Sequence, residues 1–318
     1  MILQRQSRLI GILVLLLIGA FASSGQAQSA ITLLDMGAGV RALAMGEAFV
    51  GLADDEQAAF YNPAGLAYLS GIYASANYES HLGASSYLSL LGATHGIGLG
   101  LFLFSLGDVE QRDDQDKVLG TFGYSNFAVT ASGGLPLSQI PLGFTRSLDS
   151  LSMGGRFKFL GVSTLEGGNG SAIALDLSWF FKGNNAIDHL LPGSGIHLFQ
   201  AGLSIENLVS IGLGYAGGHH ERLPFKIKTG FAISPMQSLT LSMDLAIPFE
   251  FHLGGEYSLS LPSPLSHMDI RAGAVVRGGT FAFTAGFGVV REPFRLDYAF
   301  VSHPSLPGSH RLALSLQF

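Results

Sequence analysis

Cysteine is absent from the 318-residue chain, which excludes disulfide bonds, thiolate chemistry and cysteine-ligated zinc. Charged residues are also scarce. They make up 13% of the sequence, about half of the roughly 25% found in soluble domains. The formal net charge is −6, and the basic stripe that is typical of nucleic-acid-binding proteins is missing. These shortages argue against an ordinary soluble protein and against a nucleic-acid partner.

Beyond its N-terminus the chain lacks an apolar run of roughly 20 residues, which is the length that a membrane-spanning helix requires. Yet hydrophobic residues account for 47% of the sequence, and glycine occupies 43 positions. An apolar chain without spanning helices can cross a bilayer as a closed β-barrel, because closure gives every backbone polar group a partner.

The first 27 residues have the pattern of an export signal. Arg5 and Arg8 precede an apolar core at residues 9–21, and small residues lead to a suitable cleavage site after Ala27. An N-terminal membrane anchor is the alternative, although the apolar core is short for a span. We expect residues 1–27 to be a signal peptide that directs a bacterial protein out of the cytoplasm.

From about residue 72 onward the dominant period of the sequence is two. In residues 239–247, for example, Leu, Met and Ile hold the odd positions, and Thr, Ser, Asp and Ala hold the even positions. This alternation is typical of strands with one apolar and one polar face. About fourteen such segments follow, the first near residue 72 and the last near residue 309, and many have the length of a tilted membrane strand. An even number of strands suits a bacterial single-chain barrel.

Charged residues of these segments stand out of phase with the apolar stripes. A soluble β-sandwich is the alternative, and it would have to turn the charged residues outward into water. In a barrel they face the lumen, where opposite charges pair, while the apolar side faces lipid. We therefore predict an all-β transmembrane antiparallel barrel of about 14 strands. Its predicted lumen charge network comprises Arg156, Lys158, Asp176, Asp244, Glu256, Arg271, Arg295 and Asp297.

Residues 28–70 lack the period of two and form a different region. Asp54 or Asp55 can cap a short helix through residues 56–61, and Asn62-Pro63 ends it because the residue before proline avoids the helical conformation. The region is too small and too rich in glycine to fold alone. We expect it to be a hatch or plug inside a barrel formed by residues 71–318, where strand glycines leave room for it.

The charged residues of this region include Arg41, Glu47 and the acidic run that begins at Asp54. We expect them to pair with charges of the lumen.

A family resemblance rests on the run GAGVRALAMGEAFVGLADDEQAAFYNPAGLAYL near the N-terminus and on HLGGEYSL, IRAGAVVRG, FTAGFGVV and RLDYAFVSHPSLPGSHRLALSLQF towards the end. These segments resemble PorV/PorQ-type proteins, which belong to the wider FadL-like group of outer-membrane proteins. The resemblance covers both ends well and residues 105–225 weakly. It implies a fourteen-stranded barrel with an N-terminal hatch. It also implies that Asn62, Pro63 and Gly65 are hatch-forming positions, and our hypothesis is that the hatch around them gates the ligand.

The resemblance implies two different activities. FadL-like members carry hydrophobic compounds such as long-chain fatty acids across the outer membrane, and this is the function that we expect. PorV-like members hold exported protein cargo in type IX secretion, which is the alternative, and a purely structural barrel is a third possibility. The expected partners are outer-membrane lipids, the barrel-assembly machinery, and either a hydrophobic small molecule or a secreted protein.

The last strand places Leu312, Leu314, Leu316 and Phe318 on one face. A terminal aromatic residue at the end of an alternating strand resembles the signal that the barrel-assembly machinery reads. We expect Phe318 to be this assembly signal.

Enzymatic chemistry has little support in the sequence. His219, His220 and Glu221 stand in a glycine-rich loop, where a solvated surface cluster is commoner than a metal site, and Asp113 and its neighbours lack the calcium-loop pattern. No Gly-x-Ser-x-Gly elbow or phosphate-binding loop is present. We expect no catalytic residue, metal or cofactor.

Two apolar loops, residues 133–150 and 183–215, hold Leu, Ile and Phe outside clear strands or at the ends of strands, one of which we expect to begin near residue 197. Exposed apolar surface usually marks an interaction site. Such loops would offer a groove for a hydrophobic ligand or a protein-binding face, or they would simply fold over the barrel mouth.

Overall fold

The structure is a computed structural model that describes residues 33–81, 85–141, 148–163, 169–183, 196–215, 220–221 and 223–318. The chain divides into two units, residues 1–31 and residues 32–318. The expected signal peptide and His219 lie outside the described residues.

Strands dominate the second unit. Those in the described residues are β1 (Ile72–His81), β2 (Ser85–Thr94), β3 (Ile97–Arg112), β4 (Val118–Pro136), β5 (Leu151–Ser163), β6 (Gly170–Lys182), β7 (Leu198–Tyr215), β8 (His220–Glu221), β9 (Lys226–Met236), β10 (Leu239–Ile247), β11 (Glu250–Ser260), β12 (His267–Arg277), β13 (Thr280–Arg291), β14 (Phe294–Val301) and β15 (Ser309–Gln317).

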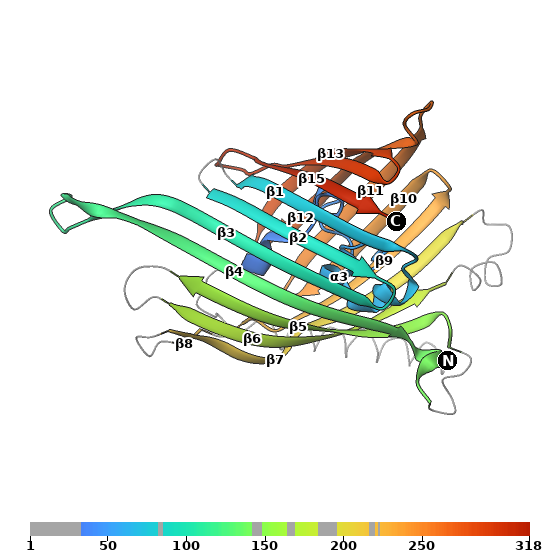
Figure 1. Ribbon diagram of the computed structural model, residues 1–318, viewed down its shortest axis with the longest axis horizontal. Helices are drawn as coiled ribbons and strands as arrows, with labels where there is room; N and C mark the ends of the chain where they lie inside the picture. The colour runs from blue at the N-terminus through green and yellow to red at the C-terminus, as the bar shows by residue number, and fades with distance from the viewer. Residues whose placement is uncertain are drawn as a thin grey trace, which may run out of the picture. The chain divides into compact units, whose positions relative to one another are not determined.

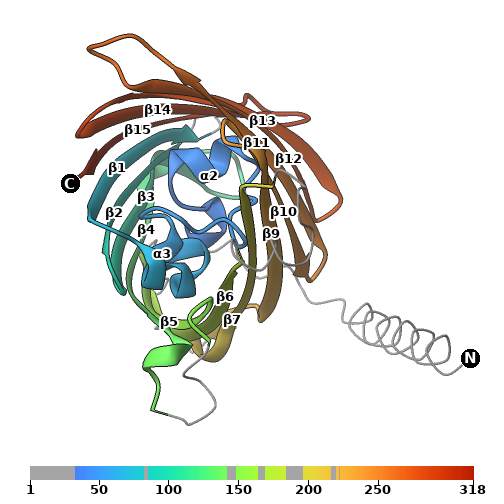
Figure 2. The ribbon, with the colours of Figure 1, turned by 90° about the vertical axis from the view of Figure 1, so that its right-hand side faces the viewer.

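The strands close into a ring, as Figure 1 and Figure 2 show. Consecutive strands pair antiparallel from β1 to β7 and from β9 to β15. β7 pairs with β9, and β1 pairs with β15, from Tyr73 opposite Gln317 to Ser80 opposite His310. The two-residue strand β8 pairs with β7. The wall formed by the described residues therefore has fourteen strands. This confirms the predicted all-β antiparallel barrel, and β1 and β15 begin at residues 72 and 309 as predicted.

The two faces of the wall differ in chemistry. On β4, Ala128, Thr130 and Ser132 are buried in the interior, whereas Phe127 and Val129 are exposed on the outside. Other strands repeat this arrangement, because side chains of a strand point alternately to its two sides. The interior is therefore lined by small and polar side chains, and large apolar side chains cover the outside.

Residues 33–69, here called the inner segment, lie within the ring (Figure 2). They form the 3₁₀-helix η1 (Leu33–Met36), the helices α2 (Val40–Ala44) and α3 (Ala58–Tyr61), and the 3₁₀-helix η2 (Pro63–Tyr68). Within the described part of the chain, no helix combines the length and apolar character needed to span a membrane.

Local sequence explains the turn after α3. Asp55 Oδ1 accepts a hydrogen bond from the Gln57 amide at 2.9 Å just before the helix, which is two residues shorter than predicted. Asn62 is extended and ends the helix, and its side chain accepts from the Ala64 amide at 3.2 Å. Pro63 then starts η2, where its missing N–H costs nothing.

Glycines of the wall admit the backbone of the inner segment. A Cβ atom on Gly254 of β11 would overlap the carbonyl oxygen of Met45, and one on Gly273 of β12 would overlap the amide of Gly46. The inner segment therefore contacts the wall backbone directly at these two points.

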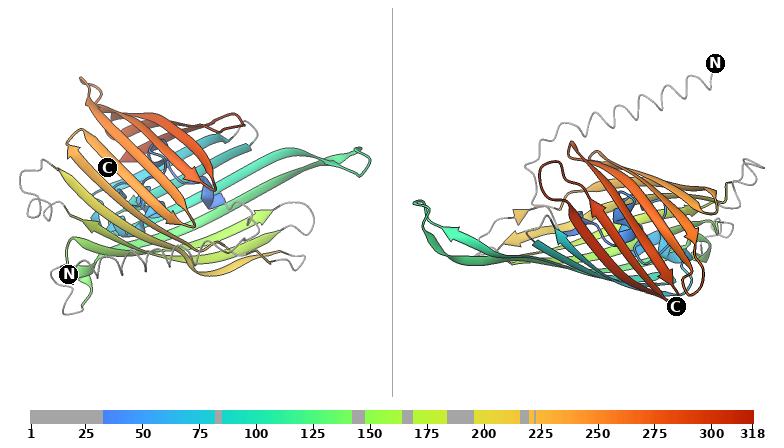
Figure 3. Two further views of the ribbon diagram at one scale, coloured as in Figure 1. Left: turned by 180° about the vertical axis from the view of Figure 1, so that it is seen from behind. Right: turned by 90° about the horizontal axis from the view of Figure 1, so that it is seen from above.

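Parts of the two apolar segments read as loops belong to strands. Residues 133–136 lie in β4, and residues 198–215 form β7, which is the strand expected to begin near residue 197 (Figure 3). Asn207 adopts a positive φ of 57° within β7. Val209 and Ile211 keep the odd positions of Leu203 and Ile205, so the period of two continues on both sides of Asn207.

Candidate functional site

A chamber lies inside the barrel between η1, α3 and strands β5, β7, β9 and β12, and we call it the basic chamber. Its charged lining consists of the basic side chains Arg156, Lys158, Lys226, Lys228 and Arg277 and the acidic side chains Asp35, Glu47 and Glu206. Its free volume is about 30 Å³, so side chains must move before any ligand larger than water can enter.

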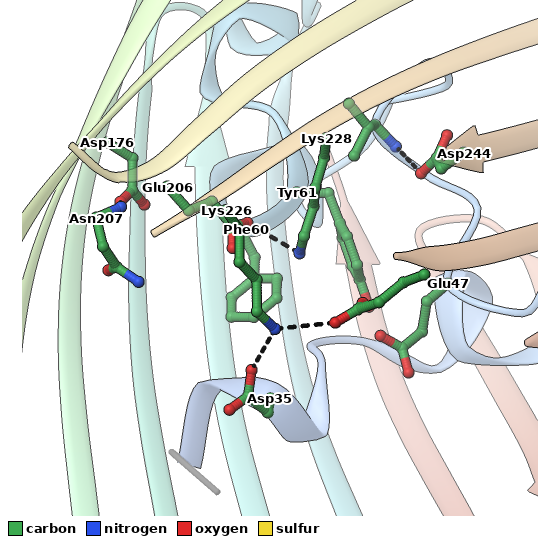
Figure 4. Close-up of polar contacts among 12 residues, drawn as sticks. Asp35, Glu47, Phe60, Tyr61, Asp176, Glu206, Asn207, Lys226, Lys228 and Asp244 are labelled. Atoms are coloured by element: carbon green, nitrogen blue, oxygen red, sulfur yellow. Dashed lines mark hydrogen bonds and ion pairs between the residues drawn. The ribbon is translucent and has the colours of Figure 1, made fainter. Parts of the chain in front are cut away.

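Lys226 joins the inner segment to the wall in this chamber. Its Nζ atom lies 2.9 Å from Asp35 of η1 and 3.1 Å from Glu250 of β11. On the same face of β9, Lys228 pairs with Glu206 of β7 at 3.0 Å (Figure 4). Both lysines therefore face the chamber.

Glu47 makes a second connection. Burial raises the pKa of its carboxyl group, but the Arg277 guanidinium at 2.9 Å outweighs that effect and holds the pKa below its ordinary value. Glu47 is therefore charged at neutral pH and ties the inner segment to β12.

Three predicted network residues border the chamber on β5 and β6. Arg156 Nη2 lies 2.6 Å from Asp176, and Lys158 Nζ lies 2.7 Å from the same carboxylate. Arg156 also donates to the carbonyl oxygen of Phe60, and Lys158 donates to Asn207 Oδ1 at 2.6 Å. All three predicted residues are buried.

Four other predicted residues form a separate cluster on β11, β12 and β14. Arg271 lies 2.6 Å from Glu256, 2.9 Å from Asp269 and 2.7 Å from Asp297. Arg295 pairs with Asp297 at 2.8 Å. The structure therefore separates the predicted network into two clusters.

Asp244, the eighth predicted residue, joins neither cluster. Its Oδ2 atom accepts hydrogen bonds from the amides of Phe49 and Val50, both at 2.8 Å. The Asp244 side chain therefore holds a turn of the inner segment through the backbone amides of that turn.

The predicted hatch residues lie where the inner segment contacts the wall. The Asn62 side-chain amide donates to the carbonyl oxygens of Val50 at 2.9 Å and Trp179 of β6 at 3.1 Å. Gly65 packs so closely on Ala53 that a Cβ atom would overlap its carbonyl oxygen. Asn62, Pro63 and Gly65 are fully buried. These contacts hold the segment in place, and a gating role stays a prediction.

Among the described residues, the pairing of the wall is interrupted beside the basic chamber. β9 pairs with β7 from Leu198 to Glu206, and the register ends where Glu206 faces Lys226, whereas the far end of β7 pairs with β8. Beyond the Glu206–Lys226 pair, β7 has a bulge at Asn207, whose amide donates to Asp176 at 2.7 Å and whose side chain donates to the Pro224 carbonyl at 2.6 Å. Residues 223–225 are not part of a strand.

Large apolar side chains surround this interruption on the outside. Val209 is 58% exposed, Ile211 71% and Phe225 45%. The interruption thus lies between an apolar outer surface and the basic chamber.

Sequence reasoning missed Asn207, which shapes this interruption. Asparagine is among the few residues that readily adopt a positive φ, and Leu223-Pro224 marks a break before β9. These local signals were available, but only the fold brings them together.

Phe318 forms backbone hydrogen bonds with Ile72, and each residue donates to the other at 2.9 Å. Its side chain is exposed at the barrel end. Its role in assembly stays a prediction. The described residues contain no group of three or more His, Asp or Glu side chains arranged to hold a metal.

Comparisons with known proteins establish the fold of the chain but do not assign the chain to a family. No family model and no curated protein matches the chain. Among solved structures, the monoaromatic hydrocarbon channel CymD superposes with a TM-score of 0.53 at 12% identity over 89% of this chain and 97% of its own. The toluene transporter TodX of Pseudomonas putida superposes with a TM-score of 0.52 at 11% identity over 88% of this chain and 98% of its own. At these identities the likeness establishes the shared barrel fold.

Proposed function

We propose that the protein is a FadL-like transport barrel of the bacterial outer membrane that passes hydrophobic compounds with an anionic head group, such as long-chain fatty acids. Export through residues 1–27, assembly through Phe318 and a lipid environment around the apolar outer face are parts of this proposal. Solved structures of the same fold, described as a monoaromatic hydrocarbon channel and a toluene transporter, support it.

The interruption of the wall beyond the Glu206–Lys226 pair is the observation that carries the proposal. It connects an outer surface that suits an alkyl chain with a chamber whose lysines suit a carboxylate. A porin for hydrophilic solutes needs an open axial channel, whereas here the inner segment fills the ring.

Lys226 is the residue that an incoming carboxylate would meet. In the closed chamber its Nζ atom binds Asp35 of the inner segment. A ligand carboxylate that replaces Asp35 on Lys226 would free η1 from β9 and enlarge the chamber. The ligand thereby binds the open state of the chamber more tightly than the closed state, and this difference in affinity shifts the equilibrium towards the open state.

Native mass spectrometry of the protein extracted gently from its own membrane tests this function. A co-purified fatty acid or similar amphiphile supports transport. A stoichiometric protein partner without a small ligand would instead favour a secretion component that binds protein cargo.

A further inference from the structure

A second cavity, which we call the acidic cavity, opens at the barrel end where Phe318 lies. Its volume is about 770 Å³, within the range of sites that hold small organic ligands. Six carboxylates and two guanidinium groups line it. The acidic run Asp54, Asp55 and Glu56 of the inner segment forms one side.

Both guanidinium groups already form ion pairs with carboxylates other than Glu56, and the buried Nη2 atom of Arg295 has no hydrogen-bond partner among the described residues. Arg41 binds Asp54, Asp55 and Glu256, at 2.6, 3.0 and 2.7 Å. Arg295 binds Asp297, which lies behind the cavity surface, at 2.8 Å. Even when the neighbouring Arg271 is counted with them, three guanidiniums face seven carboxylates in and directly behind the lining.

Glu56 is the buried carboxylate of the lining that lacks a direct ion pair among the described residues, although the charge of Arg295 acts on it from a greater distance. It is only 6% exposed, and Ser75 of β1 donates a hydrogen bond to it. A buried carboxylate without a paired cation is costly, and a partly enclosed site with excess negative charge concentrates the potential that attracts cations. Burial and the neighbouring Asp55 raise the pKa of Glu56 to about 7, in agreement with this excess.

The shape and lining of the cavity identify the kind of cation. The described residues offer no metal-ligand cluster, and the volume far exceeds that of a metal ion. Apolar side chains, Val290, Pro293 and Leu316 among them, complete the lining and provide surface for methylene groups.

We propose that the acidic cavity binds a linear organic polycation, in which protonated primary amines are spaced along an aliphatic chain. Glu56 and Asp54 bind the ammonium groups, and the apolar lining contacts the methylenes. Free polyamines and the lysine side chains of a partner segment both carry this chemistry. The acidic cavity lies apart from the basic chamber and shares none of its lining residues, so this proposal is independent of the transported compound.

Calorimetric titration of the full-length protein in detergent tests the proposal. The probes are spermidine, a short lysine-containing peptide, and an uncharged linear diol of similar length. Spermidine or the peptide is expected to bind with release of protons at pH 7, because a bound cation favours the ionised form of Glu56, and the diol is expected not to bind. Spermidine binding identifies a free polyamine as the ligand, and binding of the peptide alone identifies a partner segment.

Glu56→Gln is expected to weaken binding at least tenfold, and Asp54→Asn, at a more exposed carboxylate, to weaken it severalfold. Glu110→Gln, on the protruding β3–β4 hairpin, is the matched control and is expected to bind as the wild type does. Failure of both cationic probes to bind, or equal binding by Glu56→Gln, Asp54→Asn and Glu110→Gln, would overturn the proposal.

Discussion

Arg41 of the inner segment and Glu256 of β11 form a two-point ion pair across 215 positions of sequence. Arg41 Nε donates to Glu256 Oε2 at 2.8 Å, and Arg41 Nη2 donates to Glu256 Oε1 at 2.7 Å. Paired guanidinium and carboxylate groups of this geometry are both strong and directional. The pair fixes α2 against the wall, and it also neutralises one of the carboxylates that line the acidic cavity.

Replacing Arg41 tests how much the pair contributes to stability. Arg41→Met keeps most of the side-chain length but leaves the buried Asp55 without its ion pair and Glu256 with Arg271 alone, so we expect the free energy of unfolding to fall by about 3–5 kcal/mol. Urea unfolding in detergent micelles measures this change. Arg112→Met is the control: this arginine is 43% exposed, compared with 10% for Arg41, and its exposed ion pairs predict a loss below about 1 kcal/mol. Equal losses would show that the Arg41–Glu256 pair is not structural.

Alanine substitutions at two neighbouring glycines of β11 test the direct contact between the inner segment and the wall. Gly254→Ala places a methyl group against the Met45 carbonyl, and such overpacking is expected to cost about 1–3 kcal/mol. Gly255→Ala points its methyl group away, towards Leu241 at 3.4 Å, which is an ordinary contact, so stability is expected to change by less than about 0.5 kcal/mol. Thermal unfolding and limited proteolysis of the inner segment report both effects. The account is wrong if the two variants behave alike.

The sequence predicts the wall well and the contacts of its interior poorly. The sequence alone assigns Leu241 and Asp244 to opposite faces of β10, because the alternation of apolar and polar residues depends only on neighbouring positions. The partners of Asp244, the amides of Phe49 and Val50, lie almost 200 positions away and depend on the closed ring. The alternation of β7 likewise predicts a strand near residue 197, but the positive φ of Asn207 and its contacts with Asp176 and Pro224 depend on the folded ring.

Lys226 is expected to distinguish substrates by their head group. Lys226→Met is expected to lower the uptake of dodecanoate into proteoliposomes by about tenfold or more, because a hydrogen bond to a charged group contributes about 1.5–3 kcal/mol. Uptake of dodecanol is expected to stay unchanged. Lys117→Met, at an exposed lysine between β3 and β4, controls for loss of charge. A parallel loss for both substrates would mean that Lys226 maintains the structure and does not select a carboxylate.

The raised pKa of Glu56 predicts that the stability of the protein depends on pH. Because burial and Asp55 raise its folded-state pKa to about 7, above its ordinary value of 4.5, its contribution is fully present below pH 4.5 and is lost as pH rises through 7. Charged groups around it include Asp55, Asp54 and Arg295. Urea unfolding at pH 5.5 and 8.5 is therefore expected to show a smaller decline for Glu56→Gln than for the wild type. An identical decline would assign the dependence to other groups.

The central claim is that hydrophobic compounds pass through the interruption between β7 and β9, and reversible closure of that interruption tests it most directly. Since the chain has no cysteine, Asn207→Cys with Pro224→Cys introduces the only two thiols, at residues whose side chain and carbonyl lie 2.6 Å apart. A short, cleavable thiol cross-linker can join them. The account predicts that cross-linking abolishes dodecanoate uptake by the double variant in proteoliposomes and that cleavage restores it. Undiminished uptake with the cross-link in place would contradict the proposed route.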